Sequence, residues 1–326
     1  MKSLFPDYYR RFLFTTIVAV YFLIFIGSLV RSTGAGMGCP DWPKCFGLWI
    51  PPTCECQLPA DYHEKYASHG YANTDFDVFK TWTEYVNRLV GVLIGFFVLV
   101  NAVLSVRLRR KSIFLALTGV LVLLITMFQG WLGAVVVDLN LKPVIVSAHL
   151  VLASIIVSLL TLQLGVVSFT NNWGALKDIL GFRLIRTLSM VLFAAMVIQF
   201  VLGVQVRQFV DHLFAIFGYT DRTGFTEQFG FLFYVHRSFS VLVVFLSTWL
   251  LKVVLAETML HSALRTLVVS ILSTTILATL VGIILYYFEL PTFAQPFHLL
   301  TAVLLVGLMV FLNQRLYFIQ RLSPVS

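Results

Sequence analysis

Eight long apolar stretches dominate this chain of 326 residues. A transmembrane helix needs about 20 mostly apolar residues, because the hydrocarbon layer of a bilayer is about 30 Å thick. With 59% hydrophobic and 12% charged residues, the chain is too apolar for a soluble domain. The sequence therefore predicts an all-α polytopic membrane protein with eight transmembrane helices. The expected helices span residues 12–30, 82–106, 113–137, 143–168, 185–208, 230–255, 264–288 and 296–319.

Basic residues predict the orientation of these helices. Cytoplasmic loops of membrane proteins carry an excess of Lys and Arg. One side of the expected topology holds 14 basic residues and three acids, and includes the run RLRRK at 107–111. We therefore expect both termini to be cytoplasmic. The net charge of +8 follows from this topology and says nothing about nucleic acid. We expect membrane lipid, and no nucleic acid, among the partners.

The sequence contains an internal repeat. Duplicated folds are frequent among membrane transporters and other repeat proteins. Three pairs of segments align: EYVNRLVGVLIG at 84–95 with FYVHRSFSVLVV at 233–244, SAHLVLASIIV at 147–157 with PFHLLTAVLLV at 296–306, and IGSLVRS at 26–32 with LGVQVRQ at 202–208. We therefore expect two tandem four-helix bundles, residues 1–170 and 171–326, related by a pseudo-two-fold axis along the membrane normal.

The repeat places histidines at matching positions. His236 and His298 begin the sixth and eighth helices near the outer surface, and two neutral imidazoles on facing helices suit low-spin haem iron. Arg237 and Arg207 would pair with the carboxylates of such a haem. A purely structural hydrogen-bonding role for both histidines is the alternative. Four histidines are expected in loops or on the cytoplasmic side, outside any site: His63, His69, His212 and His261.

The first half differs at one of these positions. His149 matches His298, but Asn87 replaces the second histidine, and Glu84 lies one turn before it. An amide is a poor iron ligand. This half therefore has an incomplete ligand pair beside a carboxylate, as a substrate site needs. Glu84 and Arg88 also have the i, i+4 spacing of a simple ion pair, and the two roles are compatible.

Four cysteines lie in the exoplasmic loop expected at 31–81. Cys39 and Cys45 stand in GCPDWPKC, and an oxidising compartment favours a disulfide between them. Cys54 and Cys56 in TCEC are too close for an easy mutual bridge, which leaves them free, exchanging with the first pair, or modified. The bridge is either a structural staple or a redox element.

These residues resemble the haem A synthase family, membrane enzymes that mature haem O for cytochrome oxidase. The resemblance rests on GSLVRSTGAGMGCPDWPKCFG after the first helix and on EYVNR, SAH, HR and PFH on later helices, and it covers essentially the whole chain. It implies an oxidoreductase that converts a porphyrin methyl group into a formyl group in two steps. It also implies a bacterial inner membrane location, with haem O synthase and cytochrome oxidase assembly factors as partners; a homo-oligomer is left open.

The resemblance also implies roles for individual residues. A haem b would lie between His236 and His298, and haem O would lie near Glu84 and His149, with Glu84 catalytic. It further implies that the Cys39–Cys45 disulfide takes part in activity. The other residues expected to hold the two haems are Asn87, Arg88 and Arg31 for haem O, and Arg237 and Arg207 for haem b.

One residue departs from the family pattern Glu-x-x-His-Arg. Asn87 stands in place of the histidine, which leaves His149 as the evident axial ligand for haem O. The chain is then a subgroup with altered ligation, or a relative without the activity. A haem carrier or electron-transfer protein is the second hypothesis, and a structural subunit without a cofactor is the third.

Overall fold

The computed structural model describes residues 5–168, 181–219, 222–257 and 262–322. Each predicted apolar stretch is a helix, and eight of the described helices are long and apolar enough to cross a membrane. This confirms the all-α class. The helices are α1 (Asp7–Ser32), α2 (Tyr62–Lys65), α3 (Val78–Arg107), α4 (Ile113–Asp138), α5 (Pro143–Val167), α6 (Phe182–Phe217), α7 (Phe231–Ala256), α8 (Ser262–Tyr287) and α9 (Ala294–Leu322).

Polar side chains cap two helices, and a proline begins a third. The side chain of Asp77 accepts a hydrogen bond from Lys80 N at 3.1 Å, and so α3 begins well before the predicted residue 82. Ser112 caps α4 in the same way, and Pro143 opens α5. Such caps satisfy backbone N–H groups that have no partner in the first turn of a helix.

Helix α6 is much longer than predicted. It continues past residue 208 to Phe217, so that His212 lies on the helix and not in a loop. The added turns contain Asp211, which forms an i, i+4 ion pair with Arg207. Such a pair supports a helix although its charges interrupt the apolar pattern. The helix ends at Gly218, whose φ of 82° few other residues adopt.

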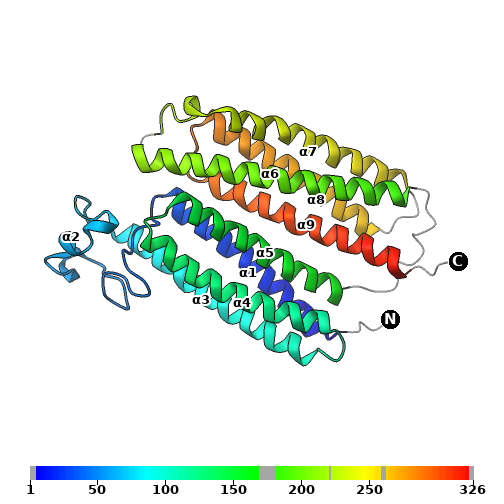
Figure 1. The fold of residues 1–326 in the computed structure, drawn as a ribbon, viewed down its shortest axis with the longest axis horizontal. Helices are drawn as coiled ribbons and strands as arrows, with labels where there is room; N and C mark the ends of the chain where they lie inside the picture. The colour runs from blue at the N-terminus through cyan, green and yellow to red at the C-terminus, as the bar shows by residue number, and fades with distance from the viewer. Residues whose placement is uncertain (1–4, 169–180, 220–221, 258–261, 323–326) are drawn as a thin grey trace.

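The helices form two groups of four (Figure 1). Helices α1, α3, α4 and α5 make the first half, and α6 to α9 make the second half. Helix α9 contacts α1 and α5 across the boundary. The predicted boundary between residues 170 and 171 lies outside the described residues. The loop between α1 and α3 projects from the end of the molecule opposite the termini (Figure 1), which we call the loop end.

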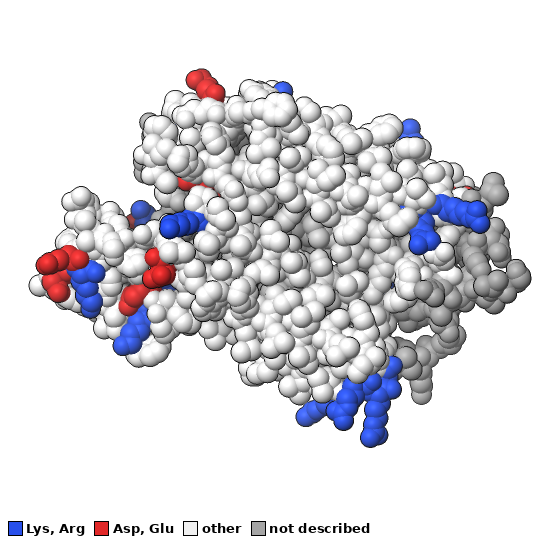
Figure 2. Space-filling model, viewed as in Figure 1, with Lys and Arg blue, Asp and Glu red and all other residues white. Residues whose placement is uncertain are grey.

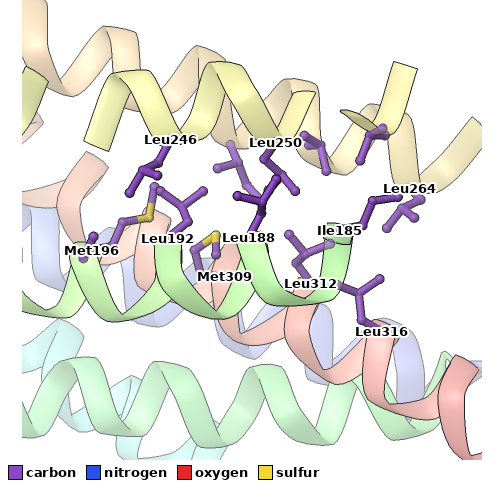
Figure 3. Close-up of a cluster of buried hydrophobic side chains, with 14 of the residues drawn as sticks. Ile185, Leu188, Leu192, Met196, Leu246, Leu250, Leu264, Met309, Leu312 and Leu316 are labelled. Atoms are coloured by element: carbon purple, nitrogen blue, oxygen red, sulfur yellow. The ribbon is translucent and has the colours of Figure 1, made fainter. Parts of the chain in front are cut away.

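Each half has its own buried apolar cluster. Leu192 of α6, Leu250 of α7 and Met309 of α9 meet inside the second half (Figure 3). Leu13, Val98 and other residues of the first half pack together with a contribution from α9. Lipid tails are as apolar as these side chains, so close packing rather than exclusion of water holds such helices together.

Charged side chains gather at the two ends of the molecule. Figure 2 shows a wide band without charge, with Lys and Arg at the end that carries the termini and both signs of charge at the loop end. A band of this kind matches the apolar layer of a bilayer.

Candidate functional site

His236 on α7 and His298 on α9 face each other in the second half. Their ring centres are 6.4 Å apart, and the planes of the rings differ by 80°. Two imidazoles bound to one metal atom from opposite sides, with bonds of about 2 Å, have ring centres roughly 6 Å apart. The structure therefore brings these two predicted residues together at a distance that suits one iron atom.

Both rings line a cavity of about 580 Å³. This volume lies in the range of about 300–1,000 Å³ that is usual for ligand and cofactor sites. The walls are mainly apolar, and Arg207 and Arg237 also line the cavity. A flat apolar macrocycle with carboxylate groups matches this combination of walls, imidazoles and cations.

A backbone hydrogen bond fixes the tautomer of His298. Its Nδ1 atom lies 3.0 Å from the carbonyl oxygen of Ala278. A carbonyl oxygen only accepts, so Nδ1 carries the proton and donates it. Nε2 therefore keeps its lone pair, which is the form that binds a metal.

A glycine on the preceding membrane helix faces each histidine of this pair. A Cβ atom added at Gly203 would lie 3.1 Å from Cε1 of His236, and one added at Gly282 would lie 3.2 Å from Cε1 of His298. These contacts are closer than ordinary van der Waals separation. The two rings therefore occupy space that only glycine leaves open.

The first half repeats this arrangement with one change. A Cβ atom added at Gly133 would lie 3.5 Å from Cε1 of His149, and one at Gly27 would lie 3.7 Å from Oδ1 of Asn87. Asn87 therefore occupies the place that an imidazole has in the second half. The Oδ1 atom of Asn87 is buried and has no hydrogen-bond partner among the described residues.

Two glutamines near these histidines were missed by sequence reasoning. Gln199 Nε2 donates to the backbone oxygen of His236 at 3.1 Å, and Gln129 Nε2 donates to that of His149 at 2.7 Å. Each glutamine precedes the facing glycine by four residues. The same spacing of glutamine and glycine in both halves is the sequence signal that could have identified these two glutamines.

Glu84 and Arg88 form an ion pair on α3, as the alternative interpretation predicted. The pair also anchors the loop. Glu84 Oε2 accepts from Cys39 N at 3.0 Å. Arg88 donates to the backbone oxygens of Asp41 and Lys44 at 2.7 and 3.0 Å, and to that of Cys39 at 3.0 Å. Glu84 is 4% exposed, so the loop covers its carboxylate.

Two further contacts hold the same segment of the loop, one from α3 and one from the loop itself. Thr81 Oγ1 donates to Gly38 O at 2.8 Å. The Tyr71 hydroxyl donates to Met37 O at 3.0 Å. Burial raises the pKa of Tyr71 well above its usual value, so that this hydroxyl keeps the proton it donates.

The cysteines of the loop are joined in two pairs. Cys39 bonds to Cys45, in the segment that Glu84 and Arg88 hold. Cys54 bonds to Cys56, although the sequence led us to expect that these two are too close for an easy mutual bridge. Cys54 is extended and a short 3₁₀ turn follows it. The two Cα atoms are 5.2 Å apart, within the usual range for a disulfide.

Arg31 and Arg207 share one carboxylate. Arg207 Nε donates to Asp211 Oδ1 at 3.0 Å, and Arg31 forms an ion pair with the other oxygen of Asp211. Sequence reasoning predicted both arginines but missed Asp211, because an acid past the apolar run resembles a loop residue. Arg237 instead lies over the rings of Tyr234 and Tyr286, at 5.2 and 5.9 Å from the ring centres.

This fold and site define a multi-pass membrane protein with a cofactor-sized cavity between two histidines. A family model described as cytochrome oxidase assembly protein, COX15-CtaA, matches residues 10–310. The chain belongs to this family, and the resemblance to the haem A synthase family is confirmed.

Individual relatives agree with this assignment. Heme A synthase of Shewanella oneidensis is 33% identical over 147 residues, which cover 45% of this chain and 42% of the relative. Heme A synthase of Geobacillus kaustophilus is 27% identical over 129 residues, which cover 40% of this chain and 33% of the relative. The alignments thus cover less than half of each relative.

Proposed function

We propose that the protein is a haem A synthase, which oxidises a methyl group of haem O to a formyl group for cytochrome oxidase. The observation that carries this proposal is the difference between the halves. The facing rings of His236 and His298 would form a complete ligand pair, whereas His149 is matched by Asn87 near the buried Glu84. The family and the names of the relatives support the proposal.

The second half would hold haem b through His236 and His298. Arg207 and Arg237 would pair with its carboxylates, because both line the cavity. When bound, this haem supplies one-electron transfer at the site. The protein contributes a fixed tautomer at His298 and tight space around both rings.

The first half would hold haem O as substrate. His149 would orient its iron, Asn87 would hydrogen-bond substrate or water, and Arg88 and Arg31 would supply positive charge nearby. Converting the methyl group to a formyl group with water as the oxygen source releases four protons and four electrons. Glu84 would accept protons, because a buried carboxylate is a suitable general base. The four electrons would leave one at a time through the second half to an electron acceptor outside the chain, which is reduced.

The surroundings of the site support further proposals. The Cys39–Cys45 disulfide would keep the loop closed over Glu84, in an oxidising compartment.

Both termini would be cytoplasmic in a bacterial plasma membrane, because basic residues gather at the end that carries them. Haem O synthase and assembly factors would be partners. The two halves would derive from a duplication with a pseudo-two-fold axis along the membrane normal.

Extraction of haems from cells tests the activity. The chain would be expressed together with haem O synthase in a host that makes no haem A, and the haems would be separated by chromatography. We expect haem A together with its hydroxylated intermediate. Haem O alone, at normal levels of membrane-inserted protein, would refute the proposed activity.

Asn87 favours a second candidate function, a haem carrier or electron-transfer protein without synthase activity. An amide in place of an imidazole weakens the case for a fully ligated substrate. The two functions differ in their need for a proton acceptor. Glu84→Ala would abolish haem A formation by a synthase, whereas a carrier would retain its haem content and electron transfer.

A further inference from the structure

The loop end of α6 contacts both halves of the protein. Arg207 and Arg31 bind the two oxygens of Asp211. Gln208 Nε2 also donates to Ser147 Oγ on α5 at 2.9 Å. Because Arg207 lines the second-half cavity, one turn of α6 joins α1 and α5 of the first half to a wall of that cavity.

Each arginine of this cluster is one turn from a glycine that faces a candidate site. Arg31 follows Gly27 by four residues on α1, and Arg207 follows Gly203 by four residues on α6. Four residues advance a helix by about 6 Å and return to nearly the same face. Arg31 therefore lies next to the first-half site, and Arg207 lies next to the second-half site.

The cluster holds two cations and one anion. The side chains of Arg31 and Arg207 are 12% and 18% exposed, and that of Asp211 is 5% exposed. Asp211 is the acid that both arginines contact within the described part of the chain. A buried cation without a full counter-charge is costly, so the cluster favours the arrival of a further anion on either side.

The alignment of the two halves shows that this carboxylate is not repeated. Arg31 aligns with Arg207, but Ala35 stands opposite Asp211. The first half thus has the arginine without an acid of its own. Its arginine uses the acid of the second half, which makes the charge balance of the two sites interdependent.

We propose that Asp211 is a positioning residue that couples the two sites electrostatically. This inference rests on the proposed function, because it assigns haem O to the first half and haem b to the second. Asp211 holds Arg31 and Arg207 in place, and the remaining N–H groups of each guanidinium receive a porphyrin carboxylate. When a carboxylate binds Arg31, Asp211 is left to neutralise Arg207 more fully.

The coupling has a definite sign. More complete neutralisation of Arg207 makes the electrostatic potential at the second-half cavity less positive. A less positive potential stabilises the oxidised, more positive form of an iron centre. Binding of a porphyrin with free carboxylates in the first half therefore lowers the midpoint potential of the haem in the second half.

Spectroelectrochemical titration of the purified full chain with its resident haem tests this coupling. Zinc protoporphyrin serves as the probe, because it has the carboxylates of a haem and no iron. Its dimethyl ester is the control without charge. We expect the midpoint potential to fall with zinc protoporphyrin and to stay unchanged with the ester. An equal fall with the ester, or no fall with either porphyrin, would overturn the inference.

Variants locate the effect at Asp211. Asp211→Asn should abolish the fall in potential, and Asp211→Glu should retain it. Asp138→Asn removes an exposed carboxylate at the loop end of α4 and should also retain it. A full fall in Asp211→Asn would overturn the inference. If Asp211→Asn does not fold, Asp211→Glu and the ester comparison decide: a retained fall in Asp211→Glu supports the inference, and loss of the fall in that folded variant overturns it.

A second measurement separates this inference from the proposed function. It is haem A formation in cells that express the same chain together with haem O synthase. Haem A without a fall in potential would contradict the coupling alone. A fall in potential that depends on Asp211, without haem A, would leave the coupling intact and contradict the synthase activity alone.

Discussion

The ring centres of His236 and His298 lie 6.4 Å apart, the planes of the two rings are nearly perpendicular, and both rings line one cavity. Because each would supply one of two axial ligands, neither ligand alone can maintain low-spin iron. We expect His236→Ala and His298→Ala each to remove the same haem from the purified protein. Visible absorption and a haem count per chain measure this loss.

His212 provides the matched control for the histidine variants, because it lies exposed on α6. His212→Ala should keep the full haem content. Retention of a low-spin haem by both His236→Ala and His298→Ala would contradict the ligand assignment.

Alanine at Gly203 or Gly282 should weaken haem binding without removing a ligand. The added Cβ atom would lie 3.1 or 3.2 Å from an imidazole carbon, so the ring must move. Overpacking of this kind costs about 1–3 kcal/mol, which is roughly a 5- to 150-fold loss of affinity. Haem titration of the apoprotein measures the effect. Gly91→Ala is the control, since a Cβ atom there has no neighbour within 4 Å, and an equal loss in that variant would refute the steric explanation.

The sequence predicted the eight membrane-spanning stretches because bilayer thickness sets the minimum length and the apolar composition of such helices. It predicted His236, His298 and His149 because an imidazole stands out in an apolar helix. Asp211 could not be predicted, because its role depends on Arg31, which lies far away in the chain and meets it only in the folded bundle. The repeat showed which positions match, but not which helices face each other.

Local geometry explains the other differences. Cys54 and Cys56 pair because a 3₁₀ turn brings their Cα atoms together, and spacing in the sequence does not show that turn. The anchoring role of Arg88 depends on three backbone oxygens of the loop. Backbone acceptors leave no pattern in a sequence, so only the Glu84–Arg88 spacing could be recognised.

Removal of the Cys39–Cys45 disulfide should open the loop above Glu84. A bridge that closes so short a loop contributes about 2 kcal/mol through chain entropy. We expect the double change Cys39→Ser and Cys45→Ser to lower the unfolding temperature and haem A formation together. The equivalent change at Cys54 and Cys56 removes a bridge in a more exposed part of the loop. It should have a smaller effect, and equal effects would contradict a special role for the first bridge.

Glu84→Gln should reduce haem A formation more than it reduces the amount of folded protein. Breaking the buried ion pair with Arg88 costs about 3–5 kcal/mol, and loss of a general base costs a further 10²- to 10⁴-fold, roughly, in rate. Arg88→Met breaks the same pair and leaves the carboxylate. We expect haem A per folded chain to fall much further in Glu84→Gln. Equal falls in both variants would show that Glu84 only anchors the loop.

Asn87→His should create a second low-spin haem site, in the first half of the protein. Asn87 faces Gly27, as His236 faces Gly203. A Cβ atom added at Gly27 would lie 3.7 Å from Oδ1 of Asn87, which is a wider gap than the 3.1 Å between a Cβ atom added at Gly203 and Cε1 of His236. An imidazole is longer than an amide, and the wider gap leaves room for it. The added ligand would lie in the position that matches His236, while His149 matches His298. The haem count per chain and the low-spin electron paramagnetic resonance signal should both increase.

The control is Asn87→Leu, which has similar size but no ligand atom and should leave both the haem count and the signal unchanged. If Asn87→His and Asn87→Leu give the same spectra, the first half does not present this position to an iron atom, and the proposed difference between the halves has no basis.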